Sequence, residues 1–381
     1  MKRTLLAAAL FSACAATYAA DVQIYGMLDL GLGYTNTDTG IGDSTSKFDM
    51  RSGQNTGSRV GLRGSEQISE DLTVGFVLES GLTLDNGELD NAGRLFGRES
   101  NLYLQGKFGT LSFGRVGELV SGLGSYGLFG GTVSAFGTGW SNIPGHKYVL
   151  AGNFLRFDNM VTYKSPNIAG FEIYGQYTFG GDKKTYKDPL DPSITAEGTE
   201  GKSSVDRYWA LGATYKAQGI YLVGVLDSYN YASWNPLLDT GIDVDDSFRV
   251  SLGGRYDFSF GQLLAAAQYF RDIKTAISAV NTTNSGFTSS TPVDGFGLNV
   301  SGIFPAFGGR IKTSVGYMDA EKSNDASIDL KRYAAAVGFE YPLSKRTFAY
   351  VGVGTYFDEY GADGSNDAHV YSASSGLVHN F

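Results

Sequence analysis

The chain has 381 residues and a formal net charge of −9, from 30 basic and 39 acidic side chains. An acidic chain with only three histidines is a poor candidate for binding nucleic acid. Its 53 glycines are well above the ordinary share, whereas its 8 prolines are few, and tyrosine and phenylalanine number 24 each. This composition indicates many strands rather than disorder. The length allows two ordinary domains or one large all-β barrel.

The first twenty residues have the pattern of a secretory signal peptide. Lys2 and Arg3 form a basic start, an apolar run follows, and small residues precede residue 21. We expect cleavage after Ala19 or Ala20. The mature chain, 21–381, then carries 28 basic and 39 acidic residues and a net charge of −11.

The only cysteine, Cys14, lies inside this leader, so we expect a mature chain without disulfides. A lipoprotein signal at Cys14 is an alternative, but Phe11 occupies the position where such a signal normally has leucine. After residue 20, no stretch offers the 18 or more apolar residues of a membrane helix.

Apolar and polar residues alternate strictly in many later segments. In "FEIYGQYTF", Phe171 and Ile173 fall on one face, and Glu172 and Gln176 on the other. The same pattern occurs in residues 22–34, 247–258, 310–319 and 331–341. A period of two over nine or more residues indicates half-buried strands with one polar face.

We expect sixteen such strands in the mature chain. They begin near Val22, Ser58, Leu72, Arg98, Thr110, Arg156, Gly170, Arg207, Ile220, Ser247, Gln262, Asp294, Arg310, Lys331, Thr347 and Val370. Short connections, such as 217–219, 259–261 and 342–346, alternate with long polar ones at 35–56, 180–205, 232–246, 274–293 and 320–329. The strands should therefore run up and down between two different ends.

Alternation alone also fits a soluble sandwich or a lipocalin-like barrel, which bury their apolar face inside. Here the polar face carries Arg, Lys, Glu, Gln and Tyr, and aromatic residues such as Tyr34, Phe258 and Phe381 close the apolar face at strand ends. These features favour an outer-membrane barrel, with apolar residues facing lipid and aromatic girdles at the boundary. We predict an all-β, 16-stranded antiparallel transmembrane β-barrel for residues 21–381.

Residues 117–155, between the fifth and sixth expected strands, do not fit the alternation. They are rich in glycine and aromatic residues and carry almost no charge. The segment contains a G-x-G-x-x-G pattern at Gly122, Gly124 and Gly127, but no βαβ unit surrounds it. A phosphate-binding loop is therefore not expected.

Several segments resemble the trimeric general porins of β-proteobacterial outer membranes. They are "DVQIYGMLDLGLGY" (21–34), "SRVGLRGSE" (58–66), "GKFGTLSFGR" (106–115), "RFDNMVTYKSP" (156–166) and "GLVHNF" (376–381). Each is weak alone, but they occur in the family's order across the whole mature chain. The resemblance implies a channel of the Gram-negative outer membrane for passive diffusion of small hydrophilic solutes and ions, with no enzymatic activity.

The resemblance also implies how this channel is built and assembled. The third long loop, here 117–155, would fold into the barrel and narrow it. The barrels would form a homotrimer, embedded in outer-membrane lipid and lipopolysaccharide. Phe381, as the last residue, would be recognised by the barrel-assembly machinery.

Basic residues of the constriction can be assigned by local motif. In the resembling porins, wall arginines face the infolded loop. Arg59, Arg98 and Arg156 match those positions, with Arg63 and Arg115 nearby.

The strand pattern supports these arginines unequally. Arg59 and Arg63 fall on the polar face of their strand. Arg98 shares the parity of the apolar Leu102, so facing the bore requires a bulge or a break next to Glu99.

The expected counter-charges are Asp29 and Glu79, at inward strand positions, and Glu118 at the base of the loop. The family often has an acidic residue in the loop's turn, but here "YGLFGG" (126–131) has none. We therefore expect a basic filter with a mild anion preference, because charge at the narrowest part sets selectivity and many acids lie in external loops.

Two other function classes are open. A substrate-specific channel would have a solute site on the loop's aromatic residues. A barrel enzyme would need a catalytic pair containing one of the histidines His146, His369 and His379, and His379 has outward parity.

No cofactor motif is present in the sequence. The acidic stretches 85–90 ("DNGELD") and 243–246 ("DVDD") could bind divalent cations in external loops. They lack the spacing of an EF-hand, so a solvated acidic surface is the simpler interpretation.

Overall fold

The computed structural model describes residues 21–137, 139–152, 155–181, 184–274, 287, 291–361 and 367–381. The expected signal peptide, residues 1–20, lies outside the described residues. So does most of the expected long loop 274–293. No helix in the described part of the chain is both long and apolar enough to cross a membrane.

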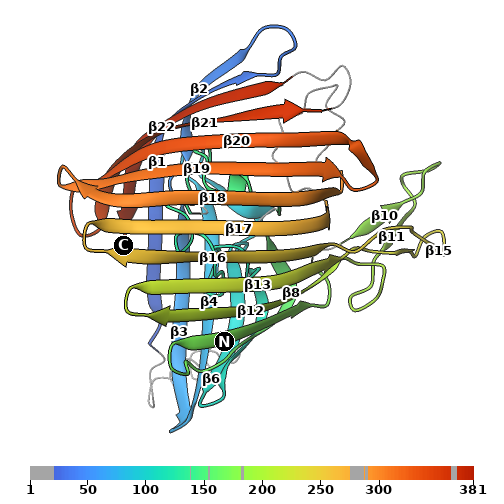
Figure 1. The fold of residues 1–381 in the computed structure, drawn as a ribbon. Helices are drawn as coiled ribbons and strands as arrows, with labels where there is room; N and C mark the ends of the chain where they lie inside the picture. The colour runs from blue at the N-terminus through green and yellow to red at the C-terminus, as the bar shows by residue number, and fades with distance from the viewer. Residues whose placement is uncertain are drawn as a thin grey trace, which may run out of the picture.

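Within the described residues, sixteen antiparallel strands form one closed barrel, as predicted (Figure 1). They are β1 (Gln23–Asp38), β3 (Arg59–Ser69), β4 (Leu72–Thr83), β6 (Glu99–Gly106), β7 (Gly109–Gly117), β8 (Arg156–Lys164), β9 (Phe171–Thr178), β12 (Arg207–Ala217), β13 (Ile220–Asn230), β16 (Phe248–Phe258), β17 (Gly261–Ile273), β18 (Val293–Ala306), β19 (Gly309–Lys322), β20 (Asp325–Pro342), β21 (Thr347–Tyr360) and β22 (Ala368–Asn380). Each pairs with the next, and β22 pairs with β1. Closure leaves no open sheet edge, so the strands can satisfy their backbone groups inside lipid.

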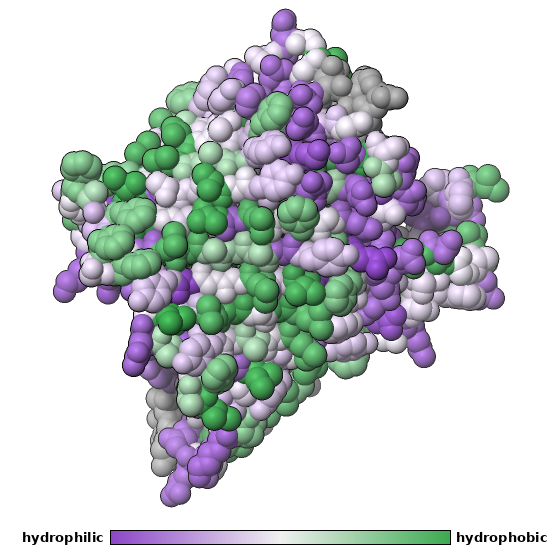
Figure 2. Space-filling model, viewed as in Figure 1, coloured by the Kyte–Doolittle hydropathy of each residue, from purple (hydrophilic) through white to green (hydrophobic). Residues whose placement is uncertain are grey.

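The alternation of the sequence places apolar side chains on the outside of this barrel. On β9, Phe171 and Ile173 are 55% and 60% exposed, whereas Tyr174 and Gln176 are buried. Figure 2 shows hydrophobic residues spread over the outer wall and hydrophilic ones gathered at one end. A water-soluble barrel would have the opposite arrangement, so this surface suits lipid.

The two ends of the barrel differ, as the connection lengths predict. At one end, turns of two residues join β12 to β13 and β16 to β17. At the other, the hairpins β10 (Thr185–Lys187) with β11 (Thr195–Glu197) and β14 (Trp234–Asn235) with β15 (Thr240–Gly241) project beyond the wall (Figure 1). The hydrophilic end of Figure 2 is the end that carries these hairpins.

The prediction of a long loop at 320–329 is wrong. β19 continues to Lys322 and β20 starts at Asp325, so only two residues connect them. Glu321 pairs with Asp329 across the two strands, with a register shift after it. The polar composition of this stretch reflects a hairpin that extends beyond the apolar band, where both faces meet water.

The expected loop 35–56 also contains a strand, β2 (Thr45–Ser52), which pairs with the C-terminal half of β1. The N-terminal half of β1 pairs with β3. β2 and β3 are therefore two halves of one barrel strand, interrupted at 53–58. This interruption is important for the site below.

The long segment between β7 and β8, residues 118–155, lies against the inner wall. Its regular structure, within the described residues, is one turn of 3₁₀ helix, η1 (His146–Tyr148). Apolar side chains along it, including Leu119, Phe129, Phe136 and Trp140, are buried. We call residues 118–155 the infolded loop. The remaining small elements, β5 (Glu88–Leu89) and α2 (Asp90–Gly93), precede β6.

Candidate functional site: a bore narrowed by the infolded loop

Wall side chains bind the backbone of the infolded loop at several points along its length. The bonds join Leu119 N to Gln176 Oε1 (3.0 Å), Ala135 N to Ser301 Oγ (2.9 Å) and Ala151 N to Gln268 Oε1 (2.6 Å). The three acceptors lie on β9, β18 and β17. The loop is therefore fixed to the wall opposite β1–β7 by polar groups that would otherwise line the bore.

Glycines at inward wall positions make room for this contact. A Cβ atom at Gly297 would lie 1.6 Å from the carbonyl oxygen of Val149. A Cβ atom at Gly352 would lie 2.5 Å from the Trp140 ring. Any larger residue at either position would displace the loop, so the wall sequence and the loop's path depend on each other.

A fully buried arginine holds both ends of the infolded loop. Arg249, on β16, donates from Nε to Asp227 Oδ1 (2.9 Å) and from Nη2 to Glu118 Oε2 (2.9 Å). Its Nη1 donates to the carbonyl oxygen of Ala151 (3.1 Å). The second carboxylate oxygen of Glu118 accepts from Leu155 N (2.8 Å). One guanidinium group therefore connects the first and last turns of the loop to the wall.

A second buried arginine holds the loop at the end of η1. Arg332, on β20, pairs with Asp358 on β21 through Nε–Oδ1 (2.5 Å) and Nη2–Oδ2 (2.6 Å). Its Nη1 donates to the carbonyl oxygen of Tyr148 (3.2 Å). Both charged side chains are 0% exposed, so desolvation makes the pairing obligatory.

The interruption at 53–58 contacts the loop from the other side of the bore. Trp140 N donates to the carbonyl oxygen of Asn55 (3.0 Å), and Ser141 N donates to that of Gln54 (2.7 Å). The infolded loop thus spans from its own wall to the broken strand of β2 and β3.

Asp29, expected as a counter-charge in the bore, instead anchors this interruption. Its carboxylate is fully buried and accepts from Asn55 N (2.6 Å), Thr56 N (2.8 Å) and the Tyr350 hydroxyl (2.7 Å). Its backbone carbonyl accepts from Gly53 N (2.9 Å). The structure covers Asp29 rather than exposing it to the bore, and Glu118 is likewise covered.

The structure brings Arg59, Glu79 and Arg98 together on the wall that faces the loop. Arg98 Nε lies 2.7 Å from Glu79 Oε1, and Arg59 Nε lies 3.9 Å from Glu79 Oε2. Arg98 sits at a bend just before β6, and its backbone N–H donates to the Glu79 carbonyl (3.1 Å). This break turns Arg98 inward: a Cβ on Gly57 would lie 2.6 Å from Arg98 Nη1.

The remaining predicted arginines lie around the group formed by Arg59, Glu79 and Arg98. Arg156, the first residue of β8, has Arg98, Arg115, Glu79 and Glu99 as charged neighbours. Arg63 donates to Gln23 Oε1 (3.1 Å) and lies 5.1 Å from the centre of the Tyr25 ring, closer to the short-turn end. We call Arg59, Arg98, Arg115 and Arg156 the arginine wall.

Sequence reasoning missed two acids and one arginine near this wall. Arg115 and Arg94 both donate to Asp158 Oδ1 at 2.8 Å. Glu99 is buried beside the infolded loop and accepts from Ser125 N (3.1 Å). Both partners of Asp158 are distant in the sequence, Arg115 by 43 residues and Arg94 by 64, so no local spacing signalled these ion pairs.

A cavity of about 450 Å³ separates the wall from the loop. Arg59, Arg63, Glu79 and Glu99 line one side, and Gly122, Gly124 and Ser125 of the loop line the other. Two of the three G-x-G-x-x-G glycines, Gly122 and Gly124, therefore line the bore.

Other candidate chemistry does not assemble in the described residues. His146 lies inside the infolded loop, where burial and the nearby Lys147 lower its pKa to about 3. His379 Nδ1 lies 2.9 Å from Thr347 Oγ1. Within the described ranges, no three or more His, Cys, Asp or Glu side chains converge as metal ligands would.

Comparison with known proteins agrees with this architecture. Residues 4–360 match the family model described as Gram-negative porin. The chain is 30% identical to an outer-membrane porin protein of Bordetella pertussis, over 99% of this chain and 98% of that protein. It is 29% identical to outer membrane porin protein 32 of Delftia acidovorans, over 92% and 88% of the two chains. Among solved structures, it is similar to an anion-selective porin from Comamonas acidovorans, with a TM-score of 0.67 and 20% identity over 95% and 100% of the chains.

A closed barrel with an apolar exterior and a charged, narrowed bore defines an outer-membrane channel. The chain belongs to the Gram-negative porin family. It is a non-enzymatic transport channel of the Gram-negative outer membrane, as the sequence predicted. Porins of this family are typically trimeric.

Proposed function

We propose that this porin passes small hydrophilic solutes and ions by passive diffusion, with a mild preference for anions. The observation that carries the proposal is the excess of arginine over carboxylate where the loop faces the wall. Among the described residues there, Arg59, Arg94, Arg98, Arg115 and Arg156 lie near Glu79, Glu99 and Asp158. A similar fold in Comamonas acidovorans is described as anion-selective, which supports the same sign.

The preference is expected to be mild because most of these arginines are paired. Glu79 partly neutralises Arg59 and Arg98, and Asp158 does the same for Arg115. The negative net charge of the whole chain does not oppose it, because charges in external loops are screened beyond about 8 Å at physiological salt.

Reversal potential in a potassium chloride gradient across a planar bilayer tests the sign of this preference. We expect permeability to chloride to exceed permeability to potassium. Arg59→Gln should lower the permeability ratio by about threefold, because one unit charge about 6 Å away in water, screened by salt, changes the anion and the cation each by a little under twofold in opposite directions. Arg346→Gln, in the exposed turn between β20 and β21, is the matched control and should leave the ratio unchanged. Clear cation preference in the unmodified channel would contradict the proposal.

We further propose that three copies assemble in the membrane, surrounded by lipid and lipopolysaccharide, and that Phe381 is the residue the barrel-assembly machinery recognises. Porins of this family are typically trimeric, which supports the proposed assembly of three copies. The mass of the detergent-solubilised particle, measured by sedimentation with the bound detergent subtracted, should correspond to three chains. A particle containing one chain would refute the trimer.

A further inference from the structure

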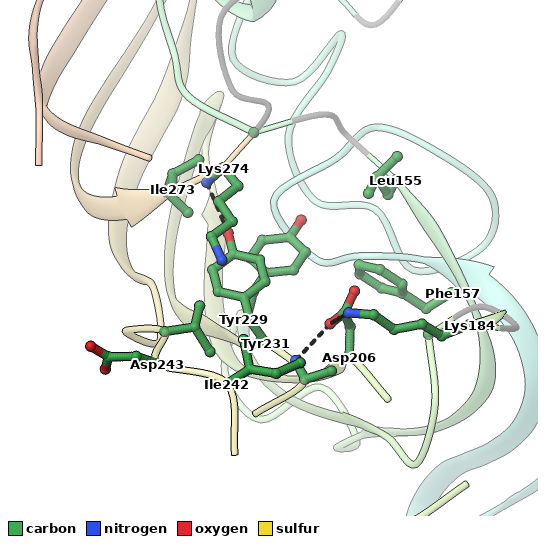
Figure 3. A pocket seen from close by; sticks show the side chains of 14 residues that line it. Leu155, Phe157, Lys184, Asp206, Tyr229, Tyr231, Ile242, Asp243, Ile273 and Lys274 are labelled. Atoms are coloured by element: carbon green, nitrogen blue, oxygen red, sulfur yellow. Dashed lines mark hydrogen bonds and ion pairs between the residues drawn. The ribbon is translucent and has the colours of Figure 1, made fainter. Parts of the chain in front are cut away.

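Two of the hollows outside the constriction differ in what surrounds them. One, of about 470 Å³, opens at the end of the long connections, where the ion pair of Lys184 and Asp206 (3.1 Å) borders it (Figure 3). The other, of about 500 Å³, lies on the outer wall over β19, β20 and β21, near the short turns. We call it the outer hollow. Apart from two glycines, its lining residues are all apolar, namely Phe307, Ile311, Val337, Phe339, Val351 and Val353.

The outer hollow belongs to the lipid-facing surface of the barrel. Val337 and Val353 lie directly across from each other on β20 and β21, and both are about half exposed, as outward positions of this wall are. At the depth of the strands, the surroundings of the wall are acyl chains. An apolar hollow stays dry, and leaving it empty would forfeit dispersion contacts along its lining. Lipid is therefore the medium that has to fill it.

The floor of the outer hollow is the backbone of two glycines. Gly338 and Gly352 line the hollow and pair with each other across β20 and β21. On the inner face of the same wall, a Cβ on Gly338 would lie 3.0 Å from the Phe136 ring, and one on Gly352 would lie 2.5 Å from the Trp140 ring. The wall thus carries the infolded loop on one face and the hollow on the other, with no side chain between them.

Phe307 closes the outer hollow at the short-turn end. It lies in the turn between β18 and β19, is 86% exposed and has a left-handed φ of 52°, a conformation that is unfavourable for a bulky side chain. Tyr341, on β20, is also exposed beside this turn, and a Cβ on Gly308 would lie 3.5 Å from its ring. Exposed aromatic rings at this level mark the boundary between acyl chains and headgroups. Because short turns of such barrels are periplasmic, this boundary belongs to the inner leaflet.

We propose that the outer hollow binds one acyl chain of an inner-leaflet phospholipid. The chain lies on Gly338 and Gly352 between the valines, and the headgroup lies at the level of Phe307 and Tyr341. A flexible chain can follow a concave surface, whereas the wall of a second barrel is convex and would leave the hollow unfilled. The headgroup of lipopolysaccharide lies at the opposite end, beside the long connections. The proposal does not depend on the anion preference of the constriction.

Photochemical labelling in vesicles tests the site. The barrel is reconstituted in phosphatidylethanolamine that contains a small fraction of the same lipid with a diazirine on one acyl chain, and mass spectrometry of peptides locates the attached lipid after illumination. We expect the lining of the outer hollow to be labelled about threefold more than Ile173 and Leu211, which are outward and exposed on β9 and β12. A few additional dispersion contacts supply such an excess. Equal labelling would show an ordinary stretch of wall, and weaker labelling would show that protein covers the hollow. Either result would overturn the proposal.

Two variants distinguish the hollow from the wall around it. Val351→Phe places a ring in the hollow and should reduce its labelling about threefold, to the level of Ile173 and Leu211. Val315→Phe is the matched control, because Val315 is exposed on the neighbouring strand β19 and lies outside the hollow lining. It should leave the labelling unchanged. The folded band on a gel reports separately that each barrel is intact. If Val351→Phe is labelled in the hollow as the unmodified protein is, the proposal is wrong.

Discussion

Replacing Arg249 by methionine should release both ends of the infolded loop and destabilise the folded barrel by about 3–5 kcal/mol, the usual loss when one partner of a buried ion pair is removed. Asp227 and Glu118 would remain buried without their counter-charge, and the Ala151 carbonyl would lose its donor. We expect larger open-channel current fluctuations, because the loop would move in the bore, and a lower unfolding temperature.

Single-channel recording and the temperature at which the folded band disappears on a gel measure the two effects. Arg271→Met is the matched control. Arg271 lies on β17, across from Phe248, the residue next to Arg249 in the chain, and its side chain is exposed. It should behave as the unmodified protein. Adding Glu118→Gln and Asp227→Asn to Arg249→Met should restore part of the stability, because no unpaired charge would stay buried. A quiet channel of normal stability in the single Arg249→Met variant would show that the loop does not depend on this residue.

Asp29→Ala should change the bore from the opposite side. The backbone N–H groups of Asn55 and Thr56 would be left buried without an acceptor, at a cost of about 3 kcal/mol for the two. Segment 53–58 would then shift, and the contact between Asn55 and Trp140 would be lost. Because Gly57 packs against Arg98, we expect a change in ion selectivity together with a change in conductance.

Matched variants separate this effect from a general loss of charge. Asp38→Ala removes an exposed carboxylate from the end of the same strand, where it caps Gly40 N (2.8 Å), and should leave selectivity unchanged. Asp29→Asn keeps an oxygen acceptor for the two N–H groups and should lie between the other variants. Selectivity and conductance are read in the same bilayer recordings. If Asp29→Ala conducts with normal selectivity, segment 53–58 does not position Arg98.

The barrel itself could be predicted because alternation is a local property of each strand. The β9 pattern, for instance, already separates Phe171 and Ile173 from Glu172 and Gln176, and the structure has them on opposite faces. β2 was missed although Phe48 and Met50 alternate with Lys47 and Asp49. Its pairing with β1 is interrupted at 53–58, and a broken strand flanked by polar residues reads as a loop.

The site was harder to predict because parity tells which way a side chain points but not what covers it. Asp29 and Glu118 were expected to carry charge into the bore, but the interruption at 53–58 covers Asp29, and Glu118 is fully buried within the infolded loop. For Arg98, strand parity alone predicts the apolar face, so an inward side chain requires a break before Glu99. The structure has a bend at Arg98, just before β6 begins at Glu99.

Arg249 and Arg332 were missed, although a signal existed. Each lies directly across from an aspartate on the neighbouring strand, Asp227 and Asp358 respectively. An arginine paired in this way behind an uncharged loop indicates burial rather than a pore-lining charge.

Phe381 takes part in joining the first and last strands of the barrel. Phe381 N donates to the Gly26 carbonyl, and Gly26 N donates to the Phe381 carbonyl, both at 3.1 Å. A Cβ on Gly26 would lie 2.2 Å from the Phe381 ring. No residue larger than glycine therefore fits at position 26 while the ring keeps this place. Because Gly26 and Phe381 lie at opposite ends of the barrel sequence, this contact is long-range and cannot form by local folding.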